Sequence, residues 1–382
     1  MSVWEAVTGQ DDRLGPLKAA AVDDGAMTHA WLITGPPGSG RSVAATAFAA
    51  ALECPDHGCG VCHSCETVLK GTHPDVTHVT TEQVQIKIDE VRHLVASASR
   101  LPGTGKWRIV IVEDADRMAE NTTNVLLKSI EEPPSRTVWI LCTPSPRDVL
   151  PTIRSRCRHV GLRIPSVEAV TRLLADRDGV DPEIARTSAL AAQCHIGIAR
   201  RLARDPAARE RRDQALALAT EARSVGTAVI AAGRLVDAAG QAAKTTNEER
   251  GEREKAELRQ ALGVEEGARV PAQIRSQLTA LDKEIKGRTR RVLRDTLDRN
   301  LVDLLSYYRD VLVLQTRAGV QLINQSRARE LAQAAETSSV AATLRRLDAI
   351  GQARTRLGMN VTPALAVEAM AVDLAYADTR PA

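Results

Sequence analysis

The run Gly-Pro-Pro-Gly-Ser-Gly-Arg-Ser at residues 35–42 constrains the fold of this chain more than any other feature. A short apolar segment precedes it, and an alanine-rich run over residues 43–52 follows. The order of strand, glycine-rich turn and helix predicts a phosphate-binding loop, in which backbone N–H groups and the positive end of a helix converge on an anion. We therefore expect an α/β fold in which Gly35, Gly38 and Gly40 bring the backbone close to a nucleotide phosphate.

The loop carries Arg41 where nucleotide hydrolases of this type have a lysine. A lysine ammonium is a compact charge that fits between the outer phosphates, whereas a guanidinium is planar, larger and geometrically committed. We expect Arg41 and Ser42 to belong to a nucleotide-binding site whose binding survives and whose catalysis is weak. A glycine turn without function is the alternative, and the flanking strand and helix argue against it.

The second motif is acidic: Glu113 and Asp114 follow the apolar run at residues 109–112. Nucleotide hydrolases usually place Asp first, to hold magnesium, and Glu second, to polarise the attacking water. The order is reversed here, and Asp114 is one methylene shorter than that base should be. A misplacement of about 1 Å can cost about a hundredfold in rate, so the pair also predicts inefficient hydrolysis. Acids that merely end a buried strand are the alternative.

Four of the seven cysteines fall within twelve residues and have the spacing of a closed tetrahedral metal site. These residues are Cys54, Cys59, Cys62 and Cys65. Thiolates close together in a reducing compartment favour a structural Zn2+ over disulfides. His57 and His63 lie nearby and are expected to be bystanders.

Composition predicts an ordinary soluble chain of two or three domains, with 382 residues, 43% hydrophobic and 26% charged. No apolar run approaches the roughly 18–20 residues that span a bilayer, and no signal region is evident, so we expect a cytoplasmic protein without a membrane partner. The net charge of +3 is too small to require nucleic acid by itself.

Three further motifs stand in order after the cysteines: Gly-Thr-His-Pro-Asp at 71–75, Leu-Leu-Lys-Ser-Ile-Glu-Glu-Pro-Pro at 126–134, and Ser-Arg-Cys at 155–157. Together with the loop and the cysteines, they make residues 1 to about 205 resemble the bacterial clamp-loader subunits of DNA polymerase III. The resemblance implies an AAA+ P-loop domain over residues 1–162, a parallel sheet with helices on both faces and a zinc module inserted at 54–65. A small helical lid over 163–207 and an all-α collar over 208–382 are expected to follow.

Within that family the chain resembles the delta-prime branch, whose nucleotide motifs are typically degraded, more than the gamma/tau motors. The resemblance implies that Arg156 projects into a neighbour's nucleotide site as an arginine finger. Thr143 and Arg200 fall where a first and a second phosphate sensor would lie. The implied partners are gamma/tau, delta, the beta sliding clamp and, through the assembled complex, primer-template DNA. The chain would belong to a DNA-directed DNA polymerase, a nucleotidyltransferase, by association only, and ATP or ADP could be bound without efficient hydrolysis.

Residues 244–299 form a charge-rich insertion that contains Gly263, Gly267 and Pro271. We expect two exposed helices joined by a loop, and favour a solvated hairpin over a DNA-binding arm because acids dilute the positive charge. Those acids are Glu248, Glu249, Glu252, Glu254 and Glu257.

Two other functions stay open. The first is a gamma-like active ATPase in which Arg41 replaces the lysine. The second is a zinc-containing DNA-binding accessory protein outside any clamp loader, with DNA contacts between Lys283 and Arg294.

Overall fold

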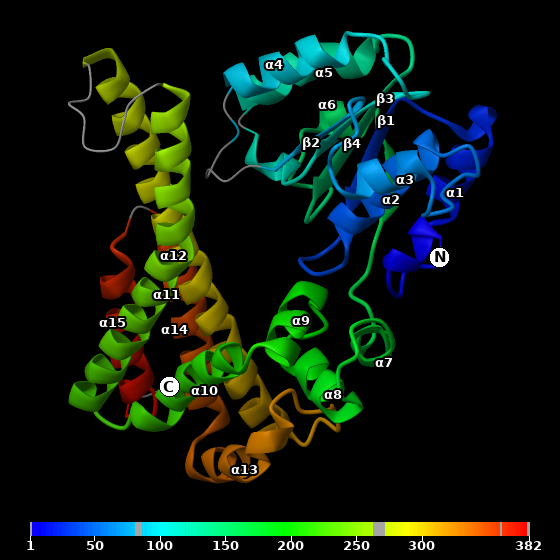
Figure 1. Ribbon diagram of the computed structural model, residues 1–382. Helices are drawn as coiled ribbons and strands as arrows, with labels where there is room; N and C mark the ends of the chain where they lie inside the picture. The colour runs from blue at the N-terminus through cyan, green and yellow to red at the C-terminus, as the bar shows by residue number, and fades with distance from the viewer. Residues whose placement is uncertain are drawn as a thin grey trace. The chain divides into compact units, whose positions relative to one another are not determined.

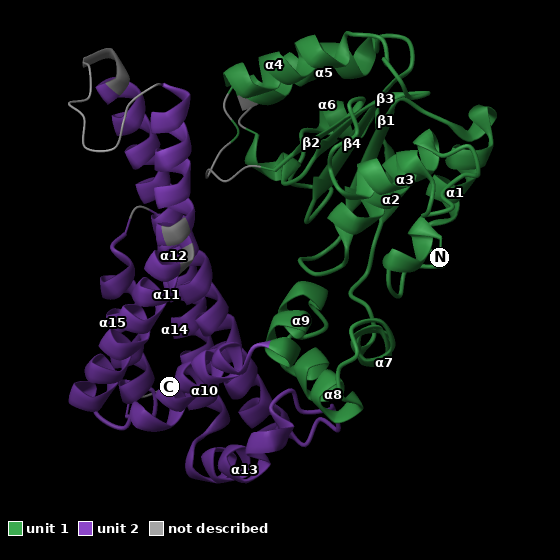
Figure 2. Cartoon of the chain, in the orientation of Figure 1, with its two compact units in different colours: residues 1–204 green, residues 205–382 purple. Residues whose placement is uncertain are grey.

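The computed structural model describes residues 2–80, 86, 88–118, 120–262, 272–359 and 361–379. The chain divides into two compact units, Met1–Arg204 and Asp205–Ala382 (Figure 2). Unit 1 contains the sheet, and the described part of unit 2 is helical. None of the described helices combines the length and the apolar character needed to cross a lipid bilayer.

The sheet of unit 1 has five strands in the order β2-β3-β4-β1-β5, and every neighbouring pair is parallel. The strands are β1 (Ala30–Thr34), β2 (Val76–Val79), β3 (Arg108–Val112), β4 (Thr137–Thr143) and β5 (Arg158–Gly161). Strands β1 and β4 are buried along their whole length, as continuous apolar runs in the middle of a parallel sheet require. The predicted α/β fold with a parallel sheet is confirmed.

Helices cover both faces of this sheet (Figure 1). Trp31 and Ile33 of β1 point to one face and pack in a core with Phe48. Leu32 points to the other face and packs in a core with Leu126 and residues of the neighbouring helices. Because side chains alternate along a strand, one apolar run supplies both cores.

The first face is covered by α1 (Gly15–Val22), α2 (Arg41–Glu53) and α3 (His63–Leu69), and the second by α4 (Ile88–Ala98), α5 (Glu120–Glu131) and α6 (Pro151–Arg154). Short helical turns occur at η1 (Val3–Ala6), η2 (Asp24–Ala26) and η3 (Ala115–Arg117). The unit ends with α7 (Val167–Arg172), the π-helical turn η4 (Leu173–Arg177), α8 (Pro182–Ala191) and α9 (Ile196–Arg204). These last elements lie within residues 163–207, the range of the predicted lid, and belong to the same unit as the sheet.

Unit 2 packs its helices around a core of leucine, alanine and tyrosine side chains. Its elements are α10 (Pro206–Glu221), α11 (Val225–Ala261), α12 (Ala272–Thr316), η5 (Gln325–Arg327), α13 (Ala328–Thr337), α14 (Val340–Gly358) and α15 (Pro363–Tyr376). The charge-rich insertion is the end of α11 and the start of α12, which form a hairpin that extends beyond α14 and α15 (Figure 1). It therefore lengthens two helices of the core rather than adding separate ones. Gly263, Gly267 and Pro271 lie outside the described residues.

Candidate nucleotide pocket and metal centre

The glycine-rich loop connects the end of β1 to the start of α2, as the motif predicts. Gly38 and Gly40 have φ of 88° and 87°, in the left-handed region that favours glycine. Gly40 is the N-cap of α2 and supplies no side-chain hydrogen bond to it. The first N–H groups of the helix are therefore available to an anion.

The loop forms one wall of a pocket of about 820 Å3. Gly38, Gly40, Arg41 and Ser42 line it on one side, and η4 and the start of α9 line it on the other with residues that include Arg200. Ligand pockets typically measure about 300–1,000 Å3, so the volume suits a nucleotide. The loop and the helices after the sheet thus meet at one site.

Gly38 is the point at which these two walls touch. A Cβ atom on Gly38 would lie 2.7 Å from the Cα atom of His195, just before α9. Real Cβ atoms do not approach a backbone atom so closely, so this position requires glycine for its contact as well as for its φ.

Gln10 ties the loop to the segment between β5 and α7, a role that our sequence reasoning missed. Its buried side chain donates from Nε2 to the carbonyls of Ser39, at 3.1 Å, and Arg163, at 2.5 Å. Its Oε1 accepts from the N–H of Arg163 at 3.2 Å. The only signal in the sequence is the opening segment Val7-Thr8-Gly9-Gln10, which resembles the family without indicating a contact.

Arg41 belongs to the loop, and its positive charge acts on the carboxylate of Glu113. The guanidinium of Arg41 donates to the carbonyl of Gly35, so the side chain folds back onto the loop. Burial raises the pKa of Glu113, but hydrogen bonds from His78 and Ser42 and the charge of Arg41 outweigh it and lower that pKa. Glu113 is therefore ionised beside the pocket at neutral pH.

Asp114 and Thr143 are outside the pocket lining. Asp114 has a left-handed φ of 52° and pairs with Arg117, whose Nε lies 3.6 Å from its Oδ2. Thr143, at the end of β4, is buried and donates from Oγ1 to the carbonyl of Ser145 at 3.2 Å. Of the two predicted sensors, only Arg200 lines the pocket, and its Nε is held 2.6 Å from Oδ2 of Asp178.

Arg156 lies in the turn between α6 and β5, away from the residues that line the pocket of its own chain. Its side chain is 40% exposed, and Nη2 lies 2.7 Å from Oε1 of Glu131. Nη1 donates to the carbonyl of Thr152 at 2.9 Å. The Ser-Arg-Cys and Ile-Glu-Glu-Pro-Pro motifs thus meet through one exposed ion pair.

The four clustered cysteines form a compact group of sulfur atoms. All four Sγ atoms lie within 4.8 Å of one another, and Sγ of Cys54 is 3.6 Å from those of Cys59 and Cys62. Zn–S bonds of about 2.3 Å in a tetrahedron place sulfur atoms about 3.8 Å apart, so the group has the size of a four-thiolate site. Backbone N–H groups of Cys59, Cys62 and Cys65 donate to sulfur atoms at 3.4 Å.

The charges of these thiols also suit a cation. Burial raises the pKa of Cys54, but N–H groups of Cys59, Gly58 and Asp56 outweigh it and bring that pKa to about 6. Burial and the neighbouring cysteines raise the pKa of Cys65, so the four thiols ionise together only with a compensating positive charge. His57 is engaged elsewhere, with Nδ1 2.7 Å from the carbonyl of Ala21, and His63 is exposed.

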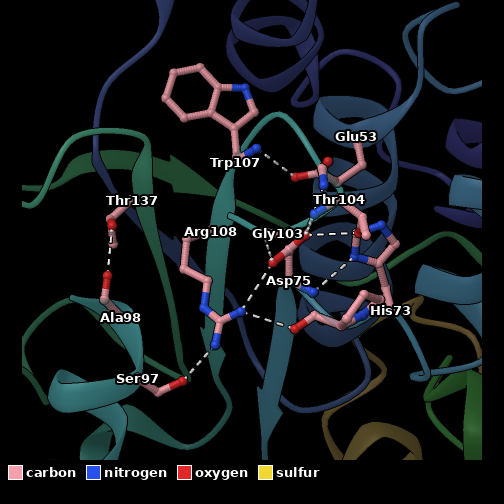
Figure 3. A network of polar contacts seen from close by, with 12 residues as sticks. Glu53, His73, Asp75, Ser97, Ala98, Gly103, Thr104, Trp107, Arg108 and Thr137 are labelled. Atoms are coloured by element: carbon pink, nitrogen blue, oxygen red, sulfur yellow. Dashed lines mark hydrogen bonds and ion pairs between the residues drawn. The ribbon is translucent and has the colours of Figure 1, made fainter. Parts of the chain in front are cut away.

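A buried network beside the cysteines explains the Gly-Thr-His-Pro-Asp motif (Figure 3). Asp75 accepts from the N–H groups of Gly103, Thr104 and Gly105 at 2.7–2.8 Å, and Arg108 lies 3.2 Å away. Glu53, the last residue of α2, accepts from the next N–H groups of the same loop, those of residues 106 and 107, at 2.8 and 2.9 Å. These acids anchor the loop that leads into β3, so the motif is structural.

Residues 11–166 match a family model described as DNA polymerase III, delta subunit. A DNA polymerase III subunit delta-prime of Pseudomonas aeruginosa is 37% identical over 153 residues, which are 38% of this chain and 47% of that protein. The corresponding protein of Bacillus subtilis is 30% identical over 186 residues, 48% of this chain and 56% of that protein.

A gamma/tau subunit of DNA polymerase III from Mycobacterium tuberculosis is 34% identical over 182 residues, 46% of this chain and 31% of that protein. The chain therefore spans about half the length of the delta-prime relatives and less of the gamma/tau relative. The matched family model, the delta-prime relatives and the P-loop sheet agree with the motifs of the sequence. Residues 11–166 are therefore similar to the clamp-loader subunits of DNA polymerase III, to delta-prime and also to gamma/tau.

Proposed function

We propose that this chain is a largely ATPase-inactive member of the clamp loader that donates Arg156 to the nucleotide site of a neighbouring gamma/tau subunit. In this role it helps to load the beta sliding clamp on primed DNA during replication, together with delta. The observation that carries the proposal is the position of Arg156, which is exposed and outside the pocket of its own chain.

Because the ion pair with Glu131 is exposed, Arg156 can leave Glu131 and pair with a phosphate of a partner subunit. Ion pairs between exposed side chains contribute about 0–1 kcal/mol, so a phosphate can replace Glu131 at little cost. A guanidinium presented across an interface adds positive charge where the transferring phosphoryl group develops negative charge. Such a residue acts on the neighbour's reaction and needs no catalysis in its own subunit.

The proposed inactivity rests on Arg41 and Asp114. The guanidinium of Arg41 is bonded to the loop itself, and Asp114, in the position of the general base, is paired with Arg117 outside the pocket lining. A base must reach the attacking water within about 3 Å. The pocket then holds ATP or ADP through Gly38, Gly40, Ser42 and Arg200 without efficient turnover.

We also propose that Cys54, Cys59, Cys62 and Cys65 hold a structural Zn2+. A closed set of four thiolates leaves no open position for a substrate. The metal would fix the segment between α2 and α3, which packs against the first face of the sheet.

The experiment measures ATP hydrolysis by a loader reconstituted with delta, gamma/tau, clamp and primed DNA, comparing Arg156→Ala with the unaltered chain. We expect hydrolysis at the interface that Arg156 serves to fall by about 10³-fold or more, with assembly unchanged by gel filtration. Arg154→Ala is the matched control, because Arg154 is an exposed arginine two residues away that donates to the carbonyl of Pro146. An unchanged rate in the Arg156 variant would exclude the arginine finger and leave this chain a structural role in the loader.

An active gamma-like ATPase is the second candidate function, because the pocket has the size of a nucleotide. Hydrolysis by the isolated chain that Asp114→Ala abolishes would favour that candidate. Absence of hydrolysis by the isolated chain, with nucleotide bound, supports the non-motor role.

A further inference from the structure

Helix α12 presents four basic side chains on one side over its first half. Lys283, Lys286, Arg290 and Arg294 follow the spacing i, i+3, i+7 and i+11, which places them along one face of a helix. The first three are exposed and Arg294 is half-buried. We refer to these four residues as the outer face of α12.

The opposite side of α12 packs against α11. Arg288 is only 9% exposed, and its Nη1 lies 3.0 Å from Oε1 of Glu254 in α11. Ile285 lies against Gly251 of α11, where an added Cβ would meet its side chain at 3.2 Å. At about 100° per residue, residues 285 and 288 fall on the side of the helix opposite to the outer face. The four basic side chains therefore point away from α11.

The acids of this part of α12 are already engaged in ion pairs. Asp282 lies 3.1 Å from Lys255, and Glu284 lies 3.4 Å from Arg288. Farther along, Asp298 pairs with Arg354 at 2.7 Å. By contrast, no ion pair joins the outer face to any described residue.

From the sequence, the acids of the insertion are expected to dilute its positive charge, which requires that acids and bases lie on the same surface. Glu252 pairs with Lys255, and Glu254 pairs with Arg250 and Arg288, so these two acids are engaged within the hairpin. The side chain of Glu249 lies outside the described residues. Glu248 and Glu257 are exposed on α11, the other helix of the hairpin. On α12, positive charge is therefore concentrated on the outer face, although the segment as a whole is mixed.

We propose that the outer face of α12 binds the phosphate backbone of DNA. Lys283 and Arg294 are eleven positions apart, which corresponds to about 16 Å of helix. One strand of a duplex presents a phosphate about every 3.4 Å along its axis, so about five phosphates lie within that span. Each of the four side chains can reach one.

A nucleic acid fits this face better than an acidic protein does. Binding energy at protein interfaces is concentrated in buried aromatic and apolar anchors. No large apolar side chain is exposed on the part of α12 that the structure describes. A row of cations without such an anchor matches a regularly charged backbone, and the 2% aromatic content argues against binding by base stacking.

The test is fluorescence anisotropy of a labelled duplex with the full chain, titrated from 50 to 200 mM salt. The quadruple variant K283Q/K286Q/R290Q/R294Q loses up to four phosphate contacts. Each contact contributes about 0.9 to the slope of log affinity against log salt, so we expect the slope to become shallower by about 3–4. Over that fourfold salt range the unaltered chain should lose about 10²-fold more affinity than the variant.

The matched control is K244Q/R259Q/R317Q/R329Q, which removes the same charge from exposed positions of unit 2 outside this face. We expect its salt slope to equal that of the unaltered chain. The charge-conserving variant K283R/K286R/R290K/R294K should also bind normally, because the positive charge of these positions is what binds the phosphates. An unchanged circular dichroism spectrum of the glutamine variant shows that it is folded.

Three results would overturn the proposal. One is DNA binding that the quadruple glutamine variant retains, and another is an equal loss in the control variant, which would mean that only net charge matters. The third is displacement of DNA by polyglutamate at matched charge, which would assign the face to an acidic protein.

Discussion

At the scale of single residues, the pocket depends on contacts that local patterns do not contain. Gly38 meets His195, and Gln10 bonds to the backbone of Ser39 and Arg163. Each contact joins the glycine-rich loop to a segment more than 100 residues farther along the chain, at His195 or at Arg163. These residues therefore connect the candidate pocket to α9 and to the segment before α7.

Gly38→Ala tests the contact between the loop and His195. A Cβ at this position combines a left-handed φ with a separation of 2.7 Å from backbone, so we expect a loss of about 1–3 kcal/mol in the free energy of unfolding. Urea titration followed by circular dichroism measures it. Gly233→Ala is the control, because its Cβ meets nothing within 4 Å in α11 and alanine should stabilise the helix by up to about 1 kcal/mol. Equal stability of both variants would show that the loop yields freely.

At the scale of elements, buried acids hold the loop of residues 103–107 against the sheet. Asp75 precedes β2 and Glu53 ends α2, so the same loop is fixed at two points beside the cysteines. The pKa values of the two carboxyls shift in opposite directions. Hydrogen bonds from Gly103, Thr104 and Gly105 outweigh burial and lower the pKa of Asp75, whereas burial raises the pKa of Glu53.

Asp75 predicts a stability that depends on pH. Because its folded pKa is lower than its unfolded value near 3.9, its contribution is fully present above about pH 5 and is lost as the pH falls below about 4. Asp75→Asn should cost about 2 kcal/mol or more at pH 7, since hydrogen bonds to a charged group contribute about 1.5–3 kcal/mol each. Unfolding by urea at pH 7 and pH 3 checks this. A difference between the two proteins that does not shrink toward pH 3 would contradict it.

At the scale of the whole molecule, each unit has a core of its own. Two clusters lie on the two faces of the sheet in unit 1, and a separate cluster lies among the helices of unit 2. The cysteine group contributes to the first of these cores only. Metal binding should therefore stabilise one unit and not the other.

Removal of the metal tests this separation. We expect one equivalent of zinc per chain, and a chelator should lower the thermal transition of unit 1 by several degrees while that of unit 2 stays in place. Calorimetry with metal analysis measures both. Cys59→Ser should lose the zinc, whereas Cys157→Ser, which changes a cysteine outside the group, should keep it. Retention of zinc by the Cys59 variant would exclude the four-thiolate site.

The sequence alone predicted the P-loop sheet, the cysteine group and the similarity to clamp-loader subunits, because these depend on short runs whose spacing sets local geometry. Arg200, predicted as a second phosphate sensor from the family resemblance, lines the pocket, and its role as a sensor stays a prediction. Tertiary structure decided that Gln10 joins the site, that Asp114 pairs with Arg117 outside the pocket, and that Arg156 rests on Glu131. It also decided the charge separation on α12. Contacts between residues distant in the chain, and the side of a helix that meets its neighbour, are set by packing of whole elements, which no local pattern encodes.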